Sequence, residues 1–176
     1  MMHPDVDRIL FSQEEITERC KELGAQISEY YEGKNPIVVG LLKGSVPFMA
    51  EIVKYITCDI EMDFMDVSSY SGTKSTEVKI VKDLDALVEG REILMVEDIV
   101  DTGKTLRKVV DFLLAKGAKD VKIVCLLDKP EGRQVEIDTD WVGFITPNEF
   151  VIGYGLDYNQ KYRNLPYVGV IKKSAI

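Results

Sequence analysis

The sequence predicts an α/β domain in which a mostly parallel, twisted sheet is flanked by helices. Short apolar runs typical of buried strands alternate along the chain with longer segments whose apolar residues recur at helical spacing. This strand–helix–strand order brings parallel strands together and places helices on the two faces of the sheet. The length of 176 residues corresponds to one domain, and no repeat or low-complexity linker divides it.

The first helix has a clear start and a clear end in the sequence. Ser12 at the N-cap and Glu15 three residues later form a capping box. The apolar stripe that follows stops before Gly33. The elements expected next are a buried strand over 37–42, a helix over 46–56 and a half-buried strand over 59–67.

A polar segment over 68–77 follows these elements. It contains a glycine and shows no apolar periodicity, so we expect a mobile loop. The segment 78–84 is then expected to return as a strand and complete a hairpin.

The second half of the chain repeats the strand–helix–strand order. A strand over 92–98 precedes a helix over 102–116, which Gly117 ends, and a buried strand over 120–127 comes next.

The last third is rich in Pro and Gly and is expected to form a small strand-rich hood. Its short strand candidates are 142–146, 150–154 and 168–171. We therefore expect a single domain over 1–176, with a core over about 12–128 and a hood from about 1–11 plus 129–176.

Composition excludes several classes of function. Lys and Arg number 22 against 30 Asp and Glu, and the net charge of −8 argues against a nucleic-acid partner. No apolar run is long enough for a membrane span, and no secretory signal stands at the N-terminus. The cysteines Cys20, Cys58 and Cys125 are odd in number and widely spaced, which favours reduced thiols and a cytoplasmic protein. The single histidine, His3, lies near the terminus, so histidine-based catalysis is not expected.

The junction over 96–105 carries the strongest chemical signal. It reads Val-Glu-Asp-Ile-Val-Asp-Thr-Gly-Lys-Thr and lies between a strand and a helix. Backbone amides, hydroxyls and the close approach that Gly103 permits all face the positive end of the helix dipole, which suits a phosphate. Glu97 and Asp98 can accept hydrogen bonds from the two hydroxyls of a ribose. The pattern therefore indicates a sugar 5-phosphate.

A nucleotide-triphosphate loop is the first alternative, because Gly103, Lys104 and Thr105 match its ending. That motif requires an earlier glycine at the position that Asp98 occupies, so a phosphotransferase is disfavoured.

The junction resembles the phosphoribosyl pyrophosphate (PRPP) binding motif of the type I phosphoribosyltransferases. Further segments match the hypoxanthine (hypoxanthine-guanine) branch of that family in order and spacing, from Leu10 to Val168. They are Leu42-Lys43-Gly44, Ser69-Tyr70, Lys129 and the segment 150–157. The resemblance implies the type I phosphoribosyltransferase fold over nearly the whole chain.

The resemblance implies a role for each matched residue. The phosphoribosyl group is expected to contact Glu97, Asp98, Asp101, Thr102, Gly103, Lys104 and Thr105. Asp101 is also expected to accept a proton from the purine imidazole as general base. Pyrophosphate is expected to contact Lys43, Gly44, Ser69, Tyr70 and Arg163, with a cis peptide between Leu42 and Lys43.

The purine site follows from the same resemblance. Lys129 is expected to read the 6-oxo group, Phe150 to stack on the base and the Val151 carbonyl to contact its edge, with Asp157 nearby. The cofactor implied is Mg²⁺, with Glu97, Asp98 and Asp157 as its ligands. From the residues alone, Phe150 also fits a core position, and the segment with Asp157 and Arg163 also fits a subunit contact.

The activity implied is purine salvage, in which 5-phosphoribose passes from PRPP to a 6-oxopurine base and pyrophosphate leaves. The resemblance also implies a homodimer or homotetramer. A second alternative is a regulatory protein of the same fold that senses PRPP, but it needs a basic nucleic-acid surface that a charge of −8 does not favour. Two features depart from the family pattern: Pro130-Glu131 follows Lys129, and Gly155 is expected to loosen the loop that carries Asp157.

Overall fold

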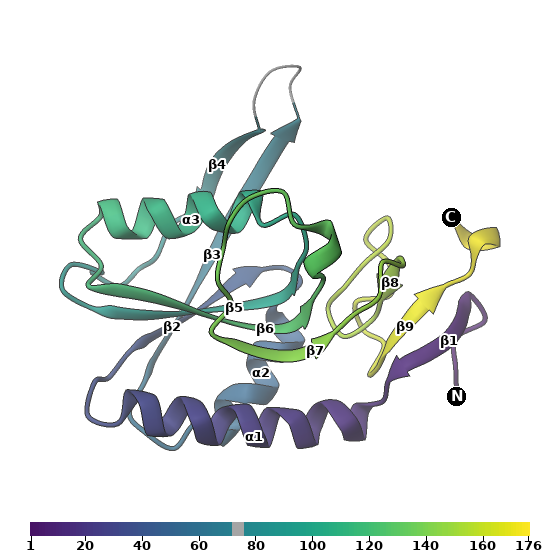
Figure 1. Cartoon of the computed structure of the whole chain (residues 1–176), viewed down its shortest axis with the longest axis horizontal. Coiled ribbons are helices and arrows are strands. Elements are labelled where there is room, and N and C mark those ends of the chain that lie inside the picture. Colours follow the sequence, from purple (N-terminus) through teal and green to yellow (C-terminus); the bar gives the residue numbers. More distant parts are fainter. Residues whose placement is uncertain (72–75) are drawn as a thin grey trace.

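The computed structural model describes residues 1–71 and 76–176, with the side chains of 69–77 left out. Its main sheet has six strands in the order β4-β3-β2-β5-β6-β7 (Figure 1). Neighbouring strands pair in parallel except β3 and β4, which are antiparallel. The strands are β2 (Ile37–Leu42), β3 (Glu61–Ser71), β4 (Thr76–Lys82), β5 (Glu92–Val100), β6 (Asp120–Asp128) and β7 (Trp141–Ile145).

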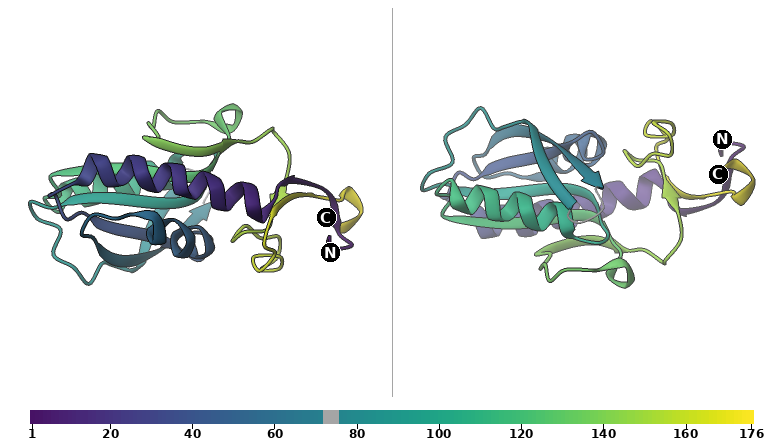
Figure 2. Two further views of the ribbon diagram at one scale, coloured as in Figure 1. Left: turned by 90° about the horizontal axis from the view of Figure 1, so that it is seen from below. Right: turned by 90° about the horizontal axis from the view of Figure 1, so that it is seen from above.

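Helices cover both faces of this sheet, as predicted. Figure 2 shows α1 (Gln13–Tyr31) over one face and α3 (Lys104–Ala115) over the other, and α2 (Val46–Ile52) lies on the α1 side. The short 3-10 helices are η1 (Val53–Tyr55), η2 (Pro130–Gly132) and η3 (Lys173–Ala175). The helix expected over 46–56 thus ends early as α2 and continues as η1.

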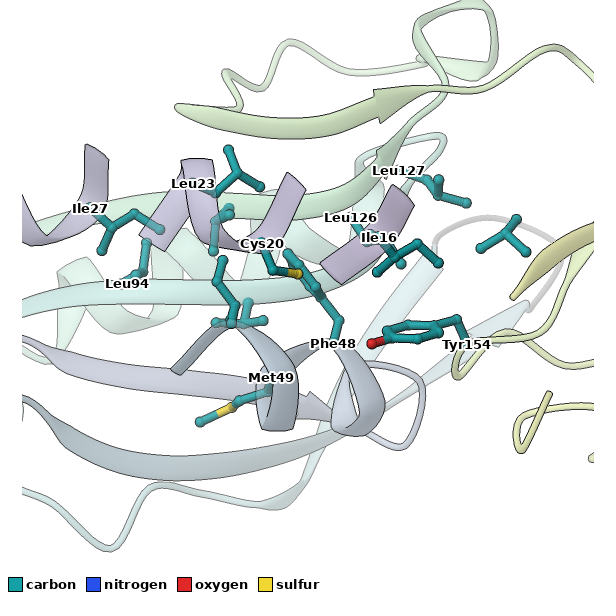
Figure 3. Packing of buried hydrophobic residues seen from close by; sticks show 14 of the residues in the cluster. Ile16, Cys20, Leu23, Ile27, Phe48, Met49, Leu94, Leu126, Leu127 and Tyr154 are labelled. Carbon is teal, nitrogen blue, oxygen red and sulfur yellow. The ribbon is translucent and has the colours of Figure 1, made fainter. Parts of the chain in front are cut away.

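The central strands separate two apolar cores because alternate side chains point to opposite faces. Val38 and Leu94 pack under α1 and α2, whereas Val39 and Met95 pack under α3. Figure 3 shows the first core, in which Tyr154 reaches Phe48 from the hood.

The capping box predicted at the first helix is confirmed. The Ser12 hydroxyl accepts a hydrogen bond from the Glu15 amide at 3.2 Å, and the Glu15 carboxylate accepts one from the Ser12 amide at 2.8 Å.

The loop predicted over 68–77 is wrong at both ends. Strand β3 continues to Ser71 and β4 already begins at Thr76, with Ser68 opposite Lys79. Antiparallel pairing satisfies the backbone groups of this polar segment, and Tyr and Thr are good strand formers. Residues 72–75 lie outside the described residues.

The hood is a small antiparallel sheet with the strand order β1-β9-β8. It contains β1 (Val6–Phe11), which no pattern predicted, β8 (Val151–Ile152) and β9 (Val168–Ile171). Both termini lie beside it (Figures 1 and 2). Strand β7, which lies within the hood range of 129–176 expected from the sequence, pairs with β6 in the main sheet.

The parallel strands β2, β5 and β6 end at one edge of the main sheet, and the hood segments meet that edge. Ligands of open α/β sheets bind at this kind of edge. Within the described residues, none of the helices has the length and apolar character needed to cross a membrane.

Candidate active site

The loop between β5 and α3 forms one wall of the site. Gly103 has a φ of +78°, a conformation that few other residues adopt without strain, and α3 begins directly after it. The Lys104 amide donates a hydrogen bond to the Thr102 hydroxyl at 3.3 Å. Glu97, Thr102 and Thr105 line a cavity of about 160 Å³ here together with Gly103, whereas Lys104 does not line it.

Glu97 and Asp98 lie at the end of β5 in two adjacent cavities. Successive strand residues point to opposite faces, so Glu97 lines the first cavity and Asp98 lines a second one of about 240 Å³. The two cavities share Ile99 and Asp101, which join them into one site.

Burial disfavours the charged form of both carboxyls. Burial, with a smaller effect of Asp98, raises the pKa of Glu97 well above its usual value. Burial also raises the pKa of Asp98. Two groups oppose this shift: the Ile99 amide, which donates to the Asp98 carboxylate at 2.8 Å, and the nearby positive charge of Arg163. One oxygen of Glu97, Oε1, is buried and has no hydrogen-bond partner among the described residues. These carboxyls are therefore suited to receive hydroxyl donors or a cation.

We expect Glu97→Gln to stabilise the protein without ligand. A carboxyl whose pKa is raised on folding stabilises the fold below its unfolded pKa of about 4.3, and this stabilisation is lost as the pH rises through the folded pKa. Near neutral pH the variant should melt about 2–4 °C higher than the wild type, and the gap should shrink in mildly acid buffer. Thermal unfolding across pH checks this, with exposed Glu29→Gln on α1 as the control. A gap that does not change with pH would contradict the assignment.

The second cavity gathers the residues predicted for the purine. Lys129, Phe150, Val151 and Asp157 all line it, together with Asp101. The Lys129 ammonium lies 4.0 Å from the Asp101 carboxylate.

Phe150 is not a core residue in this structure. Its side chain is 47% exposed, and its ring meets the Tyr158 ring edge-on with centroids 5.6 Å apart. An exposed aromatic face beside a lysine is suited to stacking on a flat base.

The loop after β2 packs against the end of β5. The predicted cis peptide between Leu42 and Lys43 is confirmed. Gly44 packs directly against Asp98: a Cβ at this position would lie 2.7 Å from the Asp98 carboxyl carbon. The Lys43 ammonium lies 3.5 Å from the amide oxygen of Gln160, which brings the loop to the hood.

Arg163 is fixed within the hood beside that loop. It donates to the Gly155 carbonyl at 2.7 Å and pairs with the Asp157 carboxylate at 3.2 Å. Gly155 has a φ of +99°, and a Cβ at this position would overlap the Gly44 carbonyl oxygen, so the glycine lets the two segments meet closely. The side chains of Ser69 and Tyr70, predicted to contact pyrophosphate, lie outside the described residues.

The carboxyls of the site are of the ligand type that a divalent cation prefers, but they do not surround a cation on all sides. Among the described residues, no group of three or more His, Cys, Asp or Glu side chains is placed to hold a metal ion. The Asp157 carboxylate already pairs with Arg163, and it accepts a hydrogen bond from the backbone N–H of Gln160 at 2.9 Å. Mg²⁺ commonly takes one or two carboxylates and completes its shell with water and substrate phosphates. The unpartnered oxygen of Glu97 matches that donor type.

Sequence reasoning missed two residues that support the site. Gln160 links Lys43 to Arg163, and Arg133 holds the backbone of the loop after β5. No local pattern marks either residue, because the contact of Gln160 with Lys43 and the contacts of Arg133 with the Val100 and Asp101 carbonyls join segments that are far apart in the sequence.

Comparisons with known proteins agree over almost the whole chain. The model of the phosphoribosyl transferase domain family matches residues 9–159. The hypoxanthine-guanine phosphoribosyltransferase of Lactococcus lactis is 60% identical over 169 residues, which cover 95% of this chain and 92% of that protein. A crystal structure of a hypoxanthine phosphoribosyltransferase from Staphylococcus aureus has a TM-score of 0.95 and 45% identity, and the match covers 99% of this chain and 96% of that one.

One group of relatives is much longer. The bifunctional protein TilS/HprT of Listeria monocytogenes is 57% identical over 173 residues, which cover 97% of this chain. This chain spans only 27% of the length of that relative.

Proposed function

This chain belongs to the phosphoribosyl transferase domain family, and from that premise we propose that it is a purine salvage enzyme. It transfers 5-phosphoribose from PRPP to hypoxanthine or guanine, which forms IMP or GMP and releases pyrophosphate. One observation carries this proposal: a single cavity brings Lys129, Phe150, Val151 and Asp157 together beside Asp101 and the phosphate-binding loop.

The cavity residues divide the recognition of the base. The Lys129 ammonium donates to the 6-oxo group, which separates hypoxanthine and guanine from adenine. Phe150 stacks on the ring, and the Val151 carbonyl accepts from its edge, with Asp157 nearby. Asp101 accepts the proton that the base loses when the glycosidic bond forms.

The loop after β5 binds the phosphoribosyl end of PRPP. The amides and hydroxyls of residues 101–105 bind the 5-phosphate at the start of α3. Glu97 and Asp98 accept hydrogen bonds from the ribose hydroxyls, directly or through water on the metal. Lys43, Gly44 and Arg163, with Ser69 and Tyr70, stabilise the departing pyrophosphate. Glu97, Asp98 and Asp157 are the residues that would hold Mg²⁺, which would supply positive charge to offset that of the phosphates.

Partners and location complete the proposal. The ligands are PRPP and a 6-oxopurine base, and the chain works in the cytoplasm as a homodimer or homotetramer without a nucleic-acid partner. The free thiols of Cys20, Cys58 and Cys125 support a reducing compartment.

A direct assay tests the function. Purified protein is mixed with PRPP, Mg²⁺ and one purine at a time, and nucleotide formation is followed by ultraviolet absorbance. We expect IMP and GMP to form and AMP not to form. If none of the purines yields nucleotide, or if adenine is the preferred base, the proposal is wrong.

We expect Lys129→Ala to damage purine use far more than PRPP use. The substitution removes a charged hydrogen-bond donor from the 6-oxo group, which corresponds to about a 10- to 100-fold loss of binding. The KM for hypoxanthine should rise by that factor, and the KM for PRPP should stay within about threefold of the wild type. Lys122→Ala is the control, since Lys122 lies near the start of β6, the strand that ends just before Lys129, and pairs with Asp120 and Asp140. Equal losses for both substrates would count against the role of Lys129.

A further inference from the structure

The segment after β6 holds the loop after β5 through three consecutive backbone carbonyls. The Val100 carbonyl accepts hydrogen bonds from the Lys129 amide and from the Arg133 guanidinium, each at 3.0 Å. The same guanidinium nitrogen donates to the Asp101 carbonyl at 2.9 Å. The Thr102 carbonyl accepts from the Gln134 amide at 2.9 Å.

Arg133 is the side chain that connects this loop to the sheet. Its second terminal nitrogen binds the Asp128 carboxylate at 2.6 Å, and both side chains are largely buried, at 19% and 10% exposure. Asp128 is the last residue of β6, and its carbonyl accepts from the Thr146 amide, so it is itself fixed. A planar guanidinium spans several acceptors in a rigid geometry that a lysine cannot reproduce.

The contacts leave two amides of the loop available to a ligand. The carbonyls of Val100 and Asp101 accept from Arg133, whereas the amides of Thr102 and Gly103 donate to no acceptor in the described part of the chain. The Asp101 carboxyl lies against Gly132, where a Cβ would be 3.0 Å from its carbon. Arg133 itself lines neither cavity of the site.

We propose that Arg133, held by Asp128, is a positioning residue that orients Asp101 and the phosphate-binding amides. This inference rests on the proposed function. Arg133 acts through the main chain of residues 100–101 and does not contact the ligand. Small misplacements of a reacting group cost about 10²-fold in rate, so its loss should reduce catalysis even where the fold survives.

Arg19 provides a matched control elsewhere in the fold. It also bridges two consecutive carbonyls, Val142 and Gly143, at 2.8 and 2.9 Å, and pairs with a carboxylate, that of Glu22. Removal of Arg19 therefore costs a comparable set of structural contacts in β7, away from the loop after β5.

The experiment compares Arg133→Ala, Arg133→Lys and Arg19→Ala in the full chain. Steady-state kinetics give kcat and the KM for PRPP, thermal unfolding gives Tm, and hydrogen exchange reports the amides of Lys129 and Gln134. For Arg133→Ala we expect kcat/KM for PRPP to fall about 10²-fold, with faster exchange at both amides. Arg133→Lys should recover only part of the loss. Arg19→Ala should lower Tm and leave kcat, KM and both amides unchanged.

The outcomes separate this inference from the proposed function. If the wild type forms nucleotide and Arg133→Ala keeps kcat/KM near the value of Arg19→Ala, Arg133 is merely structural and the inference is overturned. If the wild type forms no nucleotide, the proposed function fails. Exchange at Lys129 and Gln134 then decides alone whether Arg133 positions the loop: faster exchange supports it and unchanged exchange overturns it.

Discussion

Asp101→Asn should lower kcat by about 10²-fold or more, because the amide cannot accept the proton that the purine loses. The Asp101 side chain is 46% exposed and lines both cavities, so it borders both the purine end and the phosphate end of the proposed site. Asn has nearly the same shape and keeps the contact with Gly132. The KM for PRPP should therefore change little, and the loss should appear in kcat measured with saturating substrates.

A second aspartate isolates the chemical effect from the general effect of removing a charge. Asp111 on α3 pairs with Arg107 on the exposed side of the helix and lines neither cavity. Asp111→Asn should leave kcat within about twofold of the wild type. The Asp111 side chain lies outside the proposed site, and the loss of a surface ion pair costs little stability. Unchanged turnover in Asp101→Asn would remove Asp101 from the mechanism.

Gly44→Ala should reduce kcat/KM for PRPP about 10²-fold with a modest change in stability. The new methyl group would overlap the Asp98 carboxyl, whose carbon would lie 2.7 Å away. The side chain of Asp98 or the Lys43–Gly44 loop must then shift, and both belong to the proposed PRPP end of the site. Misplacement on this scale costs about 10²-fold in rate. Kinetics with varied PRPP, together with thermal unfolding, measure both effects.

Gly90→Ala is the matched control for the added methyl group. Gly90 has a φ of +72°, and among the described residues no neighbouring atom lies within 4 Å of the place that a Cβ would take. The substitution therefore strains the backbone without a clash. It should cost about 1–2 kcal/mol of stability and leave kcat/KM unchanged. Gly44→Ala should therefore lower mainly the activity, whereas Gly90→Ala should lower only the stability. A Gly44→Ala enzyme with wild-type kinetics would contradict the close contact with Asp98.

The parts of the fold that depend on local pattern were predictable. Ser12 and Glu15 mark the start of α1, and the alternation of Val38 and Val39 in β2 shows a strand buried on both faces. The parts that depend on distant pairing were not. The sequence of β7 resembles that of the short hood strands, but β7 pairs with β6 in the main sheet. Strand β3 extends through polar residues because β4 pairs with it.

The site divides in the same way. The resemblance assigned Lys129 and Phe150 to one purine site, and the structure places both in one cavity. Arg133 and Gln160 escaped prediction because the contacts that matter for the site, with the Asp101 carbonyl and with Lys43, join segments that are far apart in the sequence. The packing role of Gly155 has the same origin, since only its closeness to Gly44 in the structure shows it.

A crystal structure of the protein with bound IMP tests the central claim most directly. The account predicts the 5′-phosphate on the amides of residues 102–105, the ribose hydroxyls near Glu97 and Asp98, and the base between Lys129 and Phe150. Nucleotide density in another part of the molecule, or a phosphate placed away from the start of α3, would contradict it.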